Sequence, residues 1–153
     1  FDTVKSGTGT TVGRSRLYRL HFSDINNLPA GGVIEAVLDG TEEHQMMDNI
    51  AINGRGQVLI QEDVGNNAHI GKIWRYSIAQ DTLNLVAEHD PDRFAPGAPD
   101  FLTQDEESSG IIDVSDILGE GWFLLDVQAH YSIAGELVEG GQLLALHYPP
   151  GKK

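Results

Sequence analysis

The chain has 153 residues, a formal net charge of −13 and no cysteine. This length is sufficient for one domain with a hydrophobic core. The acidic surplus argues against binding of nucleic acid or anionic lipid, and the missing cysteine excludes disulfides, thiolate metal sites and cysteine nucleophiles. No apolar run approaches the roughly 20 residues of a membrane-spanning helix, so we expect no membrane span.

The chain begins at Phe1, and its only methionines are Met46 and Met47. We therefore expect a chain that was processed or cut from a longer protein. The glycine-rich run Gly7–Gly13 lacks the lysine and the strand-to-helix context of a phosphate-binding loop. We predict three parts, namely a flexible segment over residues 1–14, a β-propeller segment over 15–149 and a tail over 150–153.

Short apolar and aromatic runs, separated by glycine, asparagine and aspartate, dominate the rest of the chain. Such runs are typical of strands and turns, and no window shows a convincing helical period. The segments Ile52–Gln57 and Ala79–Thr82 have the composition of hairpin turns. We expect a single helical turn at Val114–Leu118, after Asp113 as a cap. The predicted strands are Arg16–Phe22, Val33–Leu38, Asn49–Ile52, Gln57–Gln61, Lys72–Ile78, Leu83–Glu88, Gly110–Asp113, Trp122–Gln128 and Leu143–Tyr148.

Three of the predicted strands resemble one another. A shared hydrophobic and aromatic pattern recurs in RLYRLHF (16–22), KIWRYSI (72–78) and QLLALHY (142–148), and the last two each follow a strand, a turn and another strand. Recurring groups of four antiparallel strands are the signature of propeller blades. We predict an all-β chain of about three four-stranded blades, with these runs as equivalent third strands, in a larger or assembled propeller. The alternative is a self-contained β-sandwich of about nine strands.

Polar residues gather where predicted strands begin and end. Asp48 and Asn49 lie at the start of one strand, and Glu62 and Asp63 lie at the end of the next. The start of a strand and the end of its antiparallel neighbour lie at the same end of a sheet, so we expect these side chains to meet. Carboxylate and amide oxygens are ligands that Ca²⁺ and Mg²⁺ prefer.

The stretch from residue 103 to residue 130 repeats this arrangement. Three consecutive acids end at Glu107, before one predicted strand, and the following strand ends with Gln128 and His130. Adjacent strand residues alternate sides, so we expect Glu107 to face the site and Asp105 or Glu106 to face solvent. Because the set includes a histidine, a transition metal is an alternative to Ca²⁺ or Mg²⁺ at this site. The alternative to any metal site is a set of local turn contacts and a solvated acidic loop.

The sequence resembles the PhoX-like proteins, a bacterial family of β-propellers, at DNIAINGRGQVLIQED (48–63) and EESSGIIDVSDILGEGWFLLDVQAH (106–130). Characterised members are calcium-dependent, iron-containing alkaline phosphatases, and the resemblance covers the C-terminal part of such a protein. It implies that Glu107, in E-S-S-G, is a metal ligand and that the protein is secreted or periplasmic. It also implies Ca²⁺ as cofactor, with iron in the intact protein. The family's cysteine ligand to iron is missing, so we expect the chain alone to be inactive.

The leading prediction is the calcium-liganding C-terminal part of a PhoX-like phosphatase propeller, which hydrolyses small phosphate esters when intact. One alternative is a non-catalytic, calcium-stabilised propeller module that binds a partner. Another is a lactonase-type or esterase-type propeller hydrolase. The expected partners are the remaining blades or further copies of the chain. The predicted metal ligands are Glu107, Asp48, Asn49 and Glu62, and the residues predicted to orient ligands or contact substrate are Gln128 and His130.

Overall fold

The structure, a computed structural model, describes residues 2–3 and 13–149. Residues 1, 4–12 and 150–153 lie outside the described part, and with them most of the predicted N-terminal segment and all of the predicted tail. The described residues form antiparallel sheets joined by short connections and by three short helical elements. The prediction of an all-β chain is therefore confirmed.

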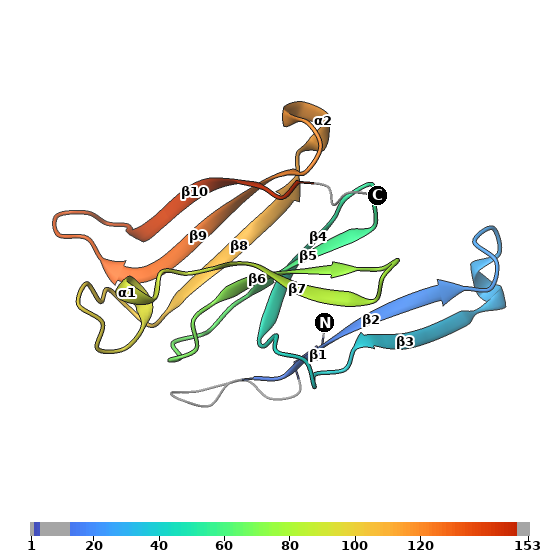
Figure 1. The fold of residues 1–153 in the computed structure, drawn as a ribbon, viewed down its shortest axis with the longest axis horizontal. Coiled ribbons are helices and arrows are strands. Elements are labelled where there is room, and N and C mark those ends of the chain that lie inside the picture. The colour runs from blue at the N-terminus through green and yellow to red at the C-terminus, as the bar shows by residue number, and fades with distance from the viewer. Residues whose placement is uncertain (1, 4–12, 150–153) are drawn as a thin grey trace.

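Three sheets make up the described fold (Figure 1). The first sheet has the order β1-β2-β3, the second β4-β5-β6-β7 and the third β10-β9-β8. Neighbouring strands follow one another in the chain, because short turns join antiparallel neighbours. The strands span Asp2–Thr3 (β1), Ser15–Phe22 (β2), Gly32–Leu38 (β3), Met47–Ile52 (β4), Gln57–Glu62 (β5), Lys72–Ser77 (β6), Thr82–Glu88 (β7), Glu106–Asp113 (β8), Trp122–Ser132 (β9) and Glu139–His147 (β10).

Both predicted hairpin turns lie between paired strands of the second sheet. In the turn at Ile52–Gln57, the amide of Gly56 donates to the carbonyl of Asn53 over 3.0 Å. In the turn at Ala79–Thr82, Asp81 has a φ of 51°, a left-handed conformation that aspartate tolerates. Turn composition therefore predicted where the chain reverses direction.

β8 is longer than the strand predicted for this region, which began at Gly110. Its pairing with β9 shifts between Ser109 and Ile112, which marks a β-bulge. Gly110 lies inside the bulge with a φ of 59°, and a Cβ atom at this position would collide with Oδ1 of Asp126. A side chain is strained at this φ, so glycine is favoured there. The glycine thus marks a bend inside the strand and not its start.

Helical turns connect some of the strands. The predicted helical turn is present over Ser115–Leu118, but Val114 and not Asp113 occupies its N-cap position. Oδ1 of Asp113 accepts a hydrogen bond from the amide of Ser115 over 3.0 Å. The sequence predicts no helix after β7, yet the carboxylate of Asp90 caps one by accepting from the amide of Asp92. No helix among the described residues is long and apolar enough to cross a membrane. The helical elements are η1 (Leu28–Ala30), α1 (Pro91–Phe94) and α2 (Ser115–Leu118).

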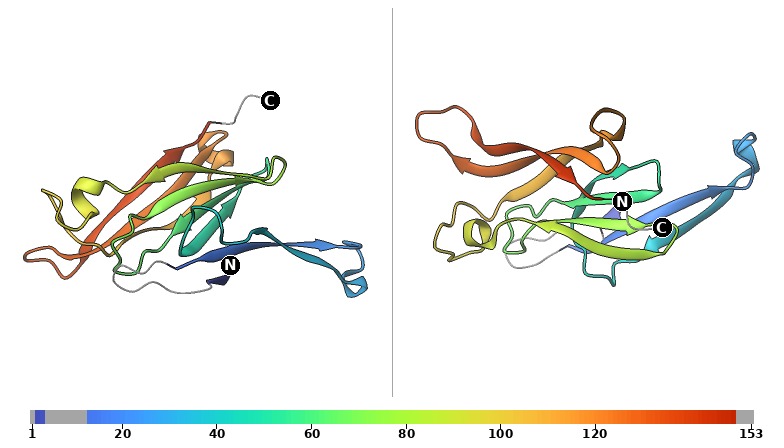
Figure 2. Two further views of the ribbon diagram at one scale, coloured as in Figure 1. Left: turned by 60° about the horizontal axis from the view of Figure 1, so that its bottom comes forward. Right: turned by 45° about the horizontal axis from the view of Figure 1, so that its top comes forward.

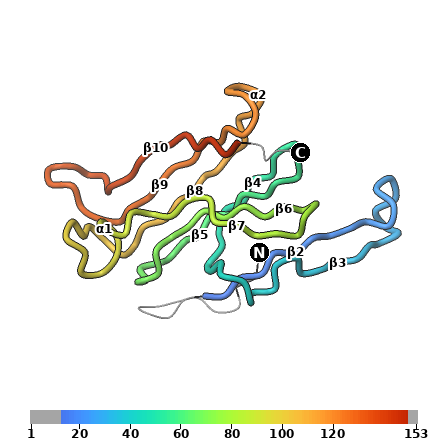
Figure 3. Tube along the Cα trace, in the orientation of Figure 1, coloured from blue at the N-terminus to red at the C-terminus, as the bar shows by residue number. Residues whose placement is uncertain are grey.

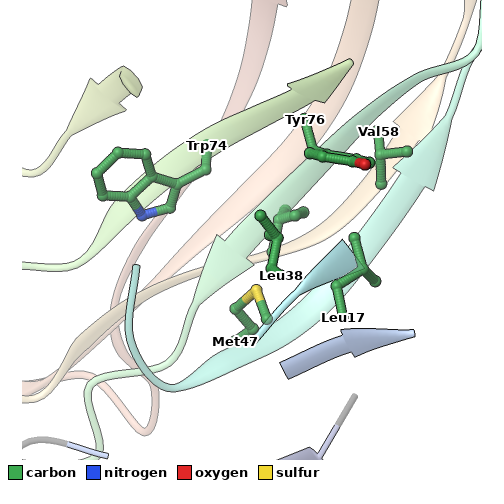
Figure 4. Packing of buried hydrophobic residues seen from close by; sticks show 7 residues of the cluster. Leu17, Leu38, Met47, Val58, Trp74 and Tyr76 are labelled. Atoms are coloured by element: carbon green, nitrogen blue, oxygen red, sulfur yellow. The ribbon is translucent and has the colours of Figure 1, made fainter. Parts of the chain in front are cut away.

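The central part of the second sheet is buried on both faces. One face packs against the first sheet, where Leu17 and Leu38 meet residues of β4, β5 and β6 (Figure 4). The other face packs against the third sheet. All six residues of β5 are buried as a result. The first cluster comprises Leu17, Leu38, Met47, Val58, Ile60, Trp74 and Tyr76, and the second comprises Leu59, Ile73, Ile111, Phe123 and Leu125.

The first and third sheets lie on opposite sides of the second sheet (Figure 2). The β2–β3 ribbon extends away from the rest of the described chain, as the trace in Figure 3 shows. β3 is exposed over its first five residues, and β10 is exposed over most of its length. The core of the described fold is therefore centred on the second sheet.

Candidate functional site

The start of β4, the end of β5 and the start of β8 lie together. Asp63, which follows β5, forms a β-bridge with Glu107 of β8. On β4, the side-chain nitrogen of Asn49 donates to Oδ2 of Asp48 over 2.6 Å and to the hydroxyl of Ser109 over 3.2 Å. The structure thus brings together three of the residues singled out as ligands, with Asp63 beside them.

Gln61 joins β5 to β8 next to this group. Its side chain is fully buried, its nitrogen donates to the carbonyl of Ser109, and its oxygen accepts from the amide of Ile111, both over 3.2 Å. Both partners flank the bulge of β8. Losing either bond would leave a buried polar group unpaired, so this amide fixes the position of β8 against the second sheet.

Glu107 lies in an unfavourable electrostatic environment. The pKa of its carboxyl is raised to about 7, first by burial and then by the carboxylates of Asp63 and Asp48. The nearby imidazole of His130 lowers this pKa and so opposes the effect in part. Negative charge on Glu107 is therefore costly near neutral pH unless a cation compensates it. Perturbed titrating groups of this kind are concentrated at functional sites, although structural networks also produce them.

Gln128 and His130 both contact carboxylates. Gln128 pairs with Glu107 across the sheet, and its side-chain nitrogen donates to Oε1 of Glu107 over 2.7 Å. Nδ1 of His130 lies 2.6 Å from Oε2 of Glu139, and this hydrogen bond is the main cause that raises the pKa of His130. Gln128 therefore touches the central carboxylate, whereas His130 is paired with β10 at the surface.

Glu62 is adjacent to Asp63 in sequence but has different surroundings. It is fully buried. Its Oε1 accepts from Nε1 of Trp74 and from the amide of Gln45, both over 2.7 Å, and its Oε2 lies 2.8 Å from Nε2 of His69. Three donors satisfy this carboxylate, so the geometry favours a structural role for Glu62 over metal binding.

The expectation was that Asp105 or Glu106 faces solvent, and it is wrong for Glu106, which is only 1% exposed. Strand alternation does place it on the face opposite Glu107, but that face lies against the second sheet. Its Oε1 accepts from the amide of Gly71 over 3.1 Å, and among the described residues its Oε2 has no hydrogen-bond partner. Burial is the main cause that raises the pKa of Glu106 to about 7. The carboxylate of Asp105 is half-buried and accepts from the amide of Asn66 over 2.7 Å.

Asp63 is the residue that the predicted set of ligands omits. The sequence analysis assigns Glu62 to this position, whereas Asp63 lies beside Glu107. Glu62 belongs to the fully buried run Gln57–Glu62, and Asp63 is the first residue after it. Since β5 is buried on both faces, the first acid beyond the strand is the one that remains accessible.

The carboxylates of Glu107, Asp63 and Asp48 and the amide oxygen of Asn49 are the donors available to a cation. Hard oxygen donors of this kind suit Ca²⁺. In the part of the chain that the structure describes, no group of three Asp, Glu, His or Cys side chains is arranged to hold a metal ion. The residues present therefore fit part of a calcium site, which needs side-chain shifts or further ligands to be complete.

A cavity of about 490 Å³ lies between the second and third sheets. Its lining includes Ile73, Phe94 and Leu125, together with Ser108 of β8. The hydroxyl of Ser108 has no hydrogen-bond partner among the described residues. Ser108 lies on the same face of β8 as Glu106, opposite Glu107. The cavity and the group of carboxylates are therefore separate features of the fold.

Comparison with known proteins gives no information on the role of the carboxylates, so their role is inferred from their contacts in the structure. The resemblance to the PhoX-like proteins stays a prediction, and the function of the chain is inferred from Glu107 and its neighbours. No family model, no curated protein and no solved structure matches the chain.

Proposed function

We propose that the chain is a calcium-binding part of a β-propeller hydrolase that acts on phosphate esters. The observation that carries this proposal is the uncompensated group of carboxylates formed by Glu107, Asp63 and Asp48. Burial and like charge raise the pKa of Glu107 to about 7. A divalent cation relieves such repulsion, so cation binding is the property that this group supports most directly.

The arrangement of the sheets supports the propeller part of the proposal. β2, β6 and β10 carry the three similar sequence runs, and each belongs to a different sheet. Direct pairing of these strands in one sheet would have excluded a propeller. The described sheets number three, whereas a sandwich has two, and they stack face to face through apolar clusters. On this proposal each sheet is a blade or part of one, and further chain or other copies supply the rest.

Glu107 and Asp63 are the residues that would hold the ion. A bound calcium ion supplies charge that polarises phosphoryl oxygens and stabilises a displacement at phosphorus. Gln128 orients the Glu107 carboxylate through the 2.7 Å hydrogen bond to Oε1. The hydrogen bond to Glu139 keeps His130 protonated to a higher pH than an isolated histidine. The second ring nitrogen of His130 is then available to donate to a phosphate oxygen.

A second candidate is a non-catalytic propeller module that calcium stabilises. Gln128 and His130 are the residues predicted to meet substrate, and both are held by carboxylates in the structure. Breaking these contacts to reach a substrate has a cost that a purely structural calcium site avoids. The acidic surface would then serve a basic partner.

Thermal unfolding with and without calcium tests the cation site. We expect addition of calcium to an EDTA-treated sample to raise the melting temperature, by an amount equivalent to about 2.7 kcal/mol at a hundredfold excess over Kd. Glu107→Gln and Asp63→Asn should each abolish this shift, because each removes a charge that the ion compensates. Glu106→Gln is the matched control, since it changes the neighbouring residue on the opposite face of β8 and should keep the shift.

Hydrolysis of p-nitrophenyl phosphate separates the two candidates. Calcium-dependent turnover that Glu107→Gln eliminates supports the hydrolase. A calcium shift without turnover, in the chain and in its assemblies, supports the non-catalytic module. Both candidate functions would be refuted if calcium did not change the melting temperature of the unsubstituted chain. They would also be refuted if Glu107→Gln and Asp63→Asn both kept the calcium-induced shift.

A further inference from the structure

The second sheet shows how sheets of this chain cover one another. Each of its faces packs apolar side chains against a neighbouring sheet. The first and third sheets each use one face in this stack, and in the described part of the chain no element covers their other face (Figure 2). We call these two surfaces the outer face of the first sheet and the outer face of the third sheet.

The outer face of the first sheet carries Leu20, Ile34 and Ala36. Leu20 pairs with Ile34 across β2 and β3, so the two side chains point to the same side, and Ala36 follows Ile34 by two residues. Arg19 points to the other side, the side of Leu17, and pairs there with Glu35 over 2.8 Å. Leu20 and Ile34 are 53% and 68% exposed. This face is therefore apolar and open.

The outer face of the third sheet carries Ile112, Leu124, Leu143 and Ala145. Ile112 pairs with Leu124, and Leu124 pairs with Ala145, so these side chains share one side of the sheet. Leu143 lies two residues before Ala145 and points the same way. Leu125 points to the opposite side, into the cluster shared with the second sheet. Ile112 and Leu143 are 55% and 81% exposed.

We propose that the outer face of the first sheet docks on the outer face of the third sheet of a second copy, so that two copies close head to tail into one ring. Each copy contributes both faces, and the ring therefore contains two identical contacts. Two copies supply six sheets, within the typical four to eight blades of closed propellers. This inference rests on the propeller arrangement proposed above, and the proposed docking face of the third sheet is also the side that carries Glu107 and Gln128.

The distribution of charge supports a second copy as the occupant of each face. Residues 2–38, which span the first sheet, contain four basic residues and three acids. Residues 106–147, which form the third sheet, contain eight acids and neither lysine nor arginine. Contact between the first sheet of one copy and the third sheet of the other therefore places the strongly acidic sheet against one with a small positive surplus. Contact between two third sheets would bring like charges together.

Sedimentation velocity and light scattering test this assembly. We expect the unsubstituted chain to have about twice the 16.6 kDa mass of one copy, with a plateau as concentration rises. Ile34→Glu and Leu143→Lys should each reduce the mass to that of one copy. Each variant carries its substitution in both copies, so both contacts of the ring are disrupted. Leu137→Lys is the control, since Leu137 is fully exposed between β9 and β10, outside both faces, and should leave the mass unchanged.

A mixture of the two variants tests the head-to-tail geometry. Equal amounts of I34E and L143K should restore the doubled mass, since one contact of the mixed pair is native and the other joins opposite introduced charges. Loss of mass in only one variant, or no restoration on mixing, overturns the proposal in favour of contact between like faces. A monomer at high micromolar concentration overturns it as well, as does a mass that rises without a plateau.

Two further measurements keep the test decisive. Circular dichroism establishes that each variant is folded, and Leu20→Glu, on the same face as Ile34, replaces Ile34→Glu if that variant does not fold. The calcium-induced shift in melting temperature is measured on the same samples. If the unsubstituted chain is a monomer and shows the calcium shift, the ring alone is refuted. If it is a dimer, and neither the dimer nor the monomeric variants show the shift, the calcium site alone is refuted.

Discussion

Glu62 and Glu107 both lie at strand ends near the same end of the sheets, yet their surroundings differ in kind. Glu62 receives hydrogen bonds from Trp74, from a backbone amide and from the ring of His69. Glu107 receives a hydrogen bond from Gln128 and faces the carboxylates of two aspartates. The neighbouring groups therefore determine the role of an acid at a strand end. Hydrogen-bond donors give it a structural role, whereas nearby carboxylates favour binding of a cation.

The two carboxylates should respond in opposite ways when they are removed. Buried donors lose their acceptor when Glu62 is lost, and each unpaired group costs its full desolvation energy. Removal of the Glu107 charge relieves repulsion as long as no cation is bound. Stability measurements on matched variants of the two residues therefore test the comparison directly.

The largest expected effect is that of Glu62→Ala. We expect it to lower the free energy of unfolding by about 3–5 kcal/mol, the range for breaking a buried charged pair. Nε1 of Trp74 and the amide of Gln45 lose their acceptor, and His69 loses its partner. Urea unfolding at pH 7 in EDTA measures this loss.

Glu107→Ala is the matched control for that measurement. It should raise the free energy of unfolding at pH 7 in EDTA, because removal of the carboxyl relieves its burial and its repulsion with Asp63 and Asp48. Equal losses for Glu62→Ala and Glu107→Ala would contradict the distinction between a structural and a ligand-binding carboxylate.

The second prediction concerns pH. The pKa values of Glu106 and Glu107 are raised to about 7 from the ordinary 4.5, so between these values the folded chain binds protons that the unfolded chain has lost. Stability in EDTA should therefore fall as pH rises from about 5 to 7. For each of the two carboxyls, the unfolding equilibrium constant should increase by up to about tenfold for each pH unit.

Single variants assign this pH dependence. Glu106→Gln and Glu107→Gln should each reduce the slope of stability against pH, measured by urea unfolding at several pH values. Saturating calcium should remove the contribution of Glu107 and leave that of Glu106, because a bound cation favours the charged form of Glu107 alone. An unchanged slope in both variants would be inconsistent with protonated carboxyls on β8.

The sheets could be predicted from the sequence because their signals are local. Period-two apolar runs and turn residues such as Asp81 predict where strands and hairpins lie, and consecutive antiparallel strands then pair with one another. The start of β8 was missed because Gly110 was interpreted as the edge of the strand, whereas it accommodates a bulge. A glycine in the sequence therefore does not distinguish the end of a strand from a bulge within it.

The group of carboxylates could be predicted only to within one residue. Strand alternation separates Glu106 from Glu107 and Glu62 from Asp63, but the sequence alone does not reveal which side another sheet covers. A buried acid is rare, and the expectation was that Asp105 or Glu106 faces solvent. The structure buries both Glu106 and Glu62, because the second sheet and its loops supply donors such as the amide of Gly71.

The smallest expected effect belongs to His130 and tests whether its ion pair is structural, like that of Glu62. Its pair with Glu139 is exposed, with 43% and 58% of the two side chains accessible. A double-mutant cycle of His130→Ala and Glu139→Gln should give a coupling below about 1 kcal/mol that weakens in high salt. The pKa of His130 is raised, so this contribution should be present below about pH 6.5 and vanish as pH rises through the raised value. A coupling above about 2 kcal/mol, or one that persists at pH 9, would instead place His130 and Glu139 with the buried, structural pairs.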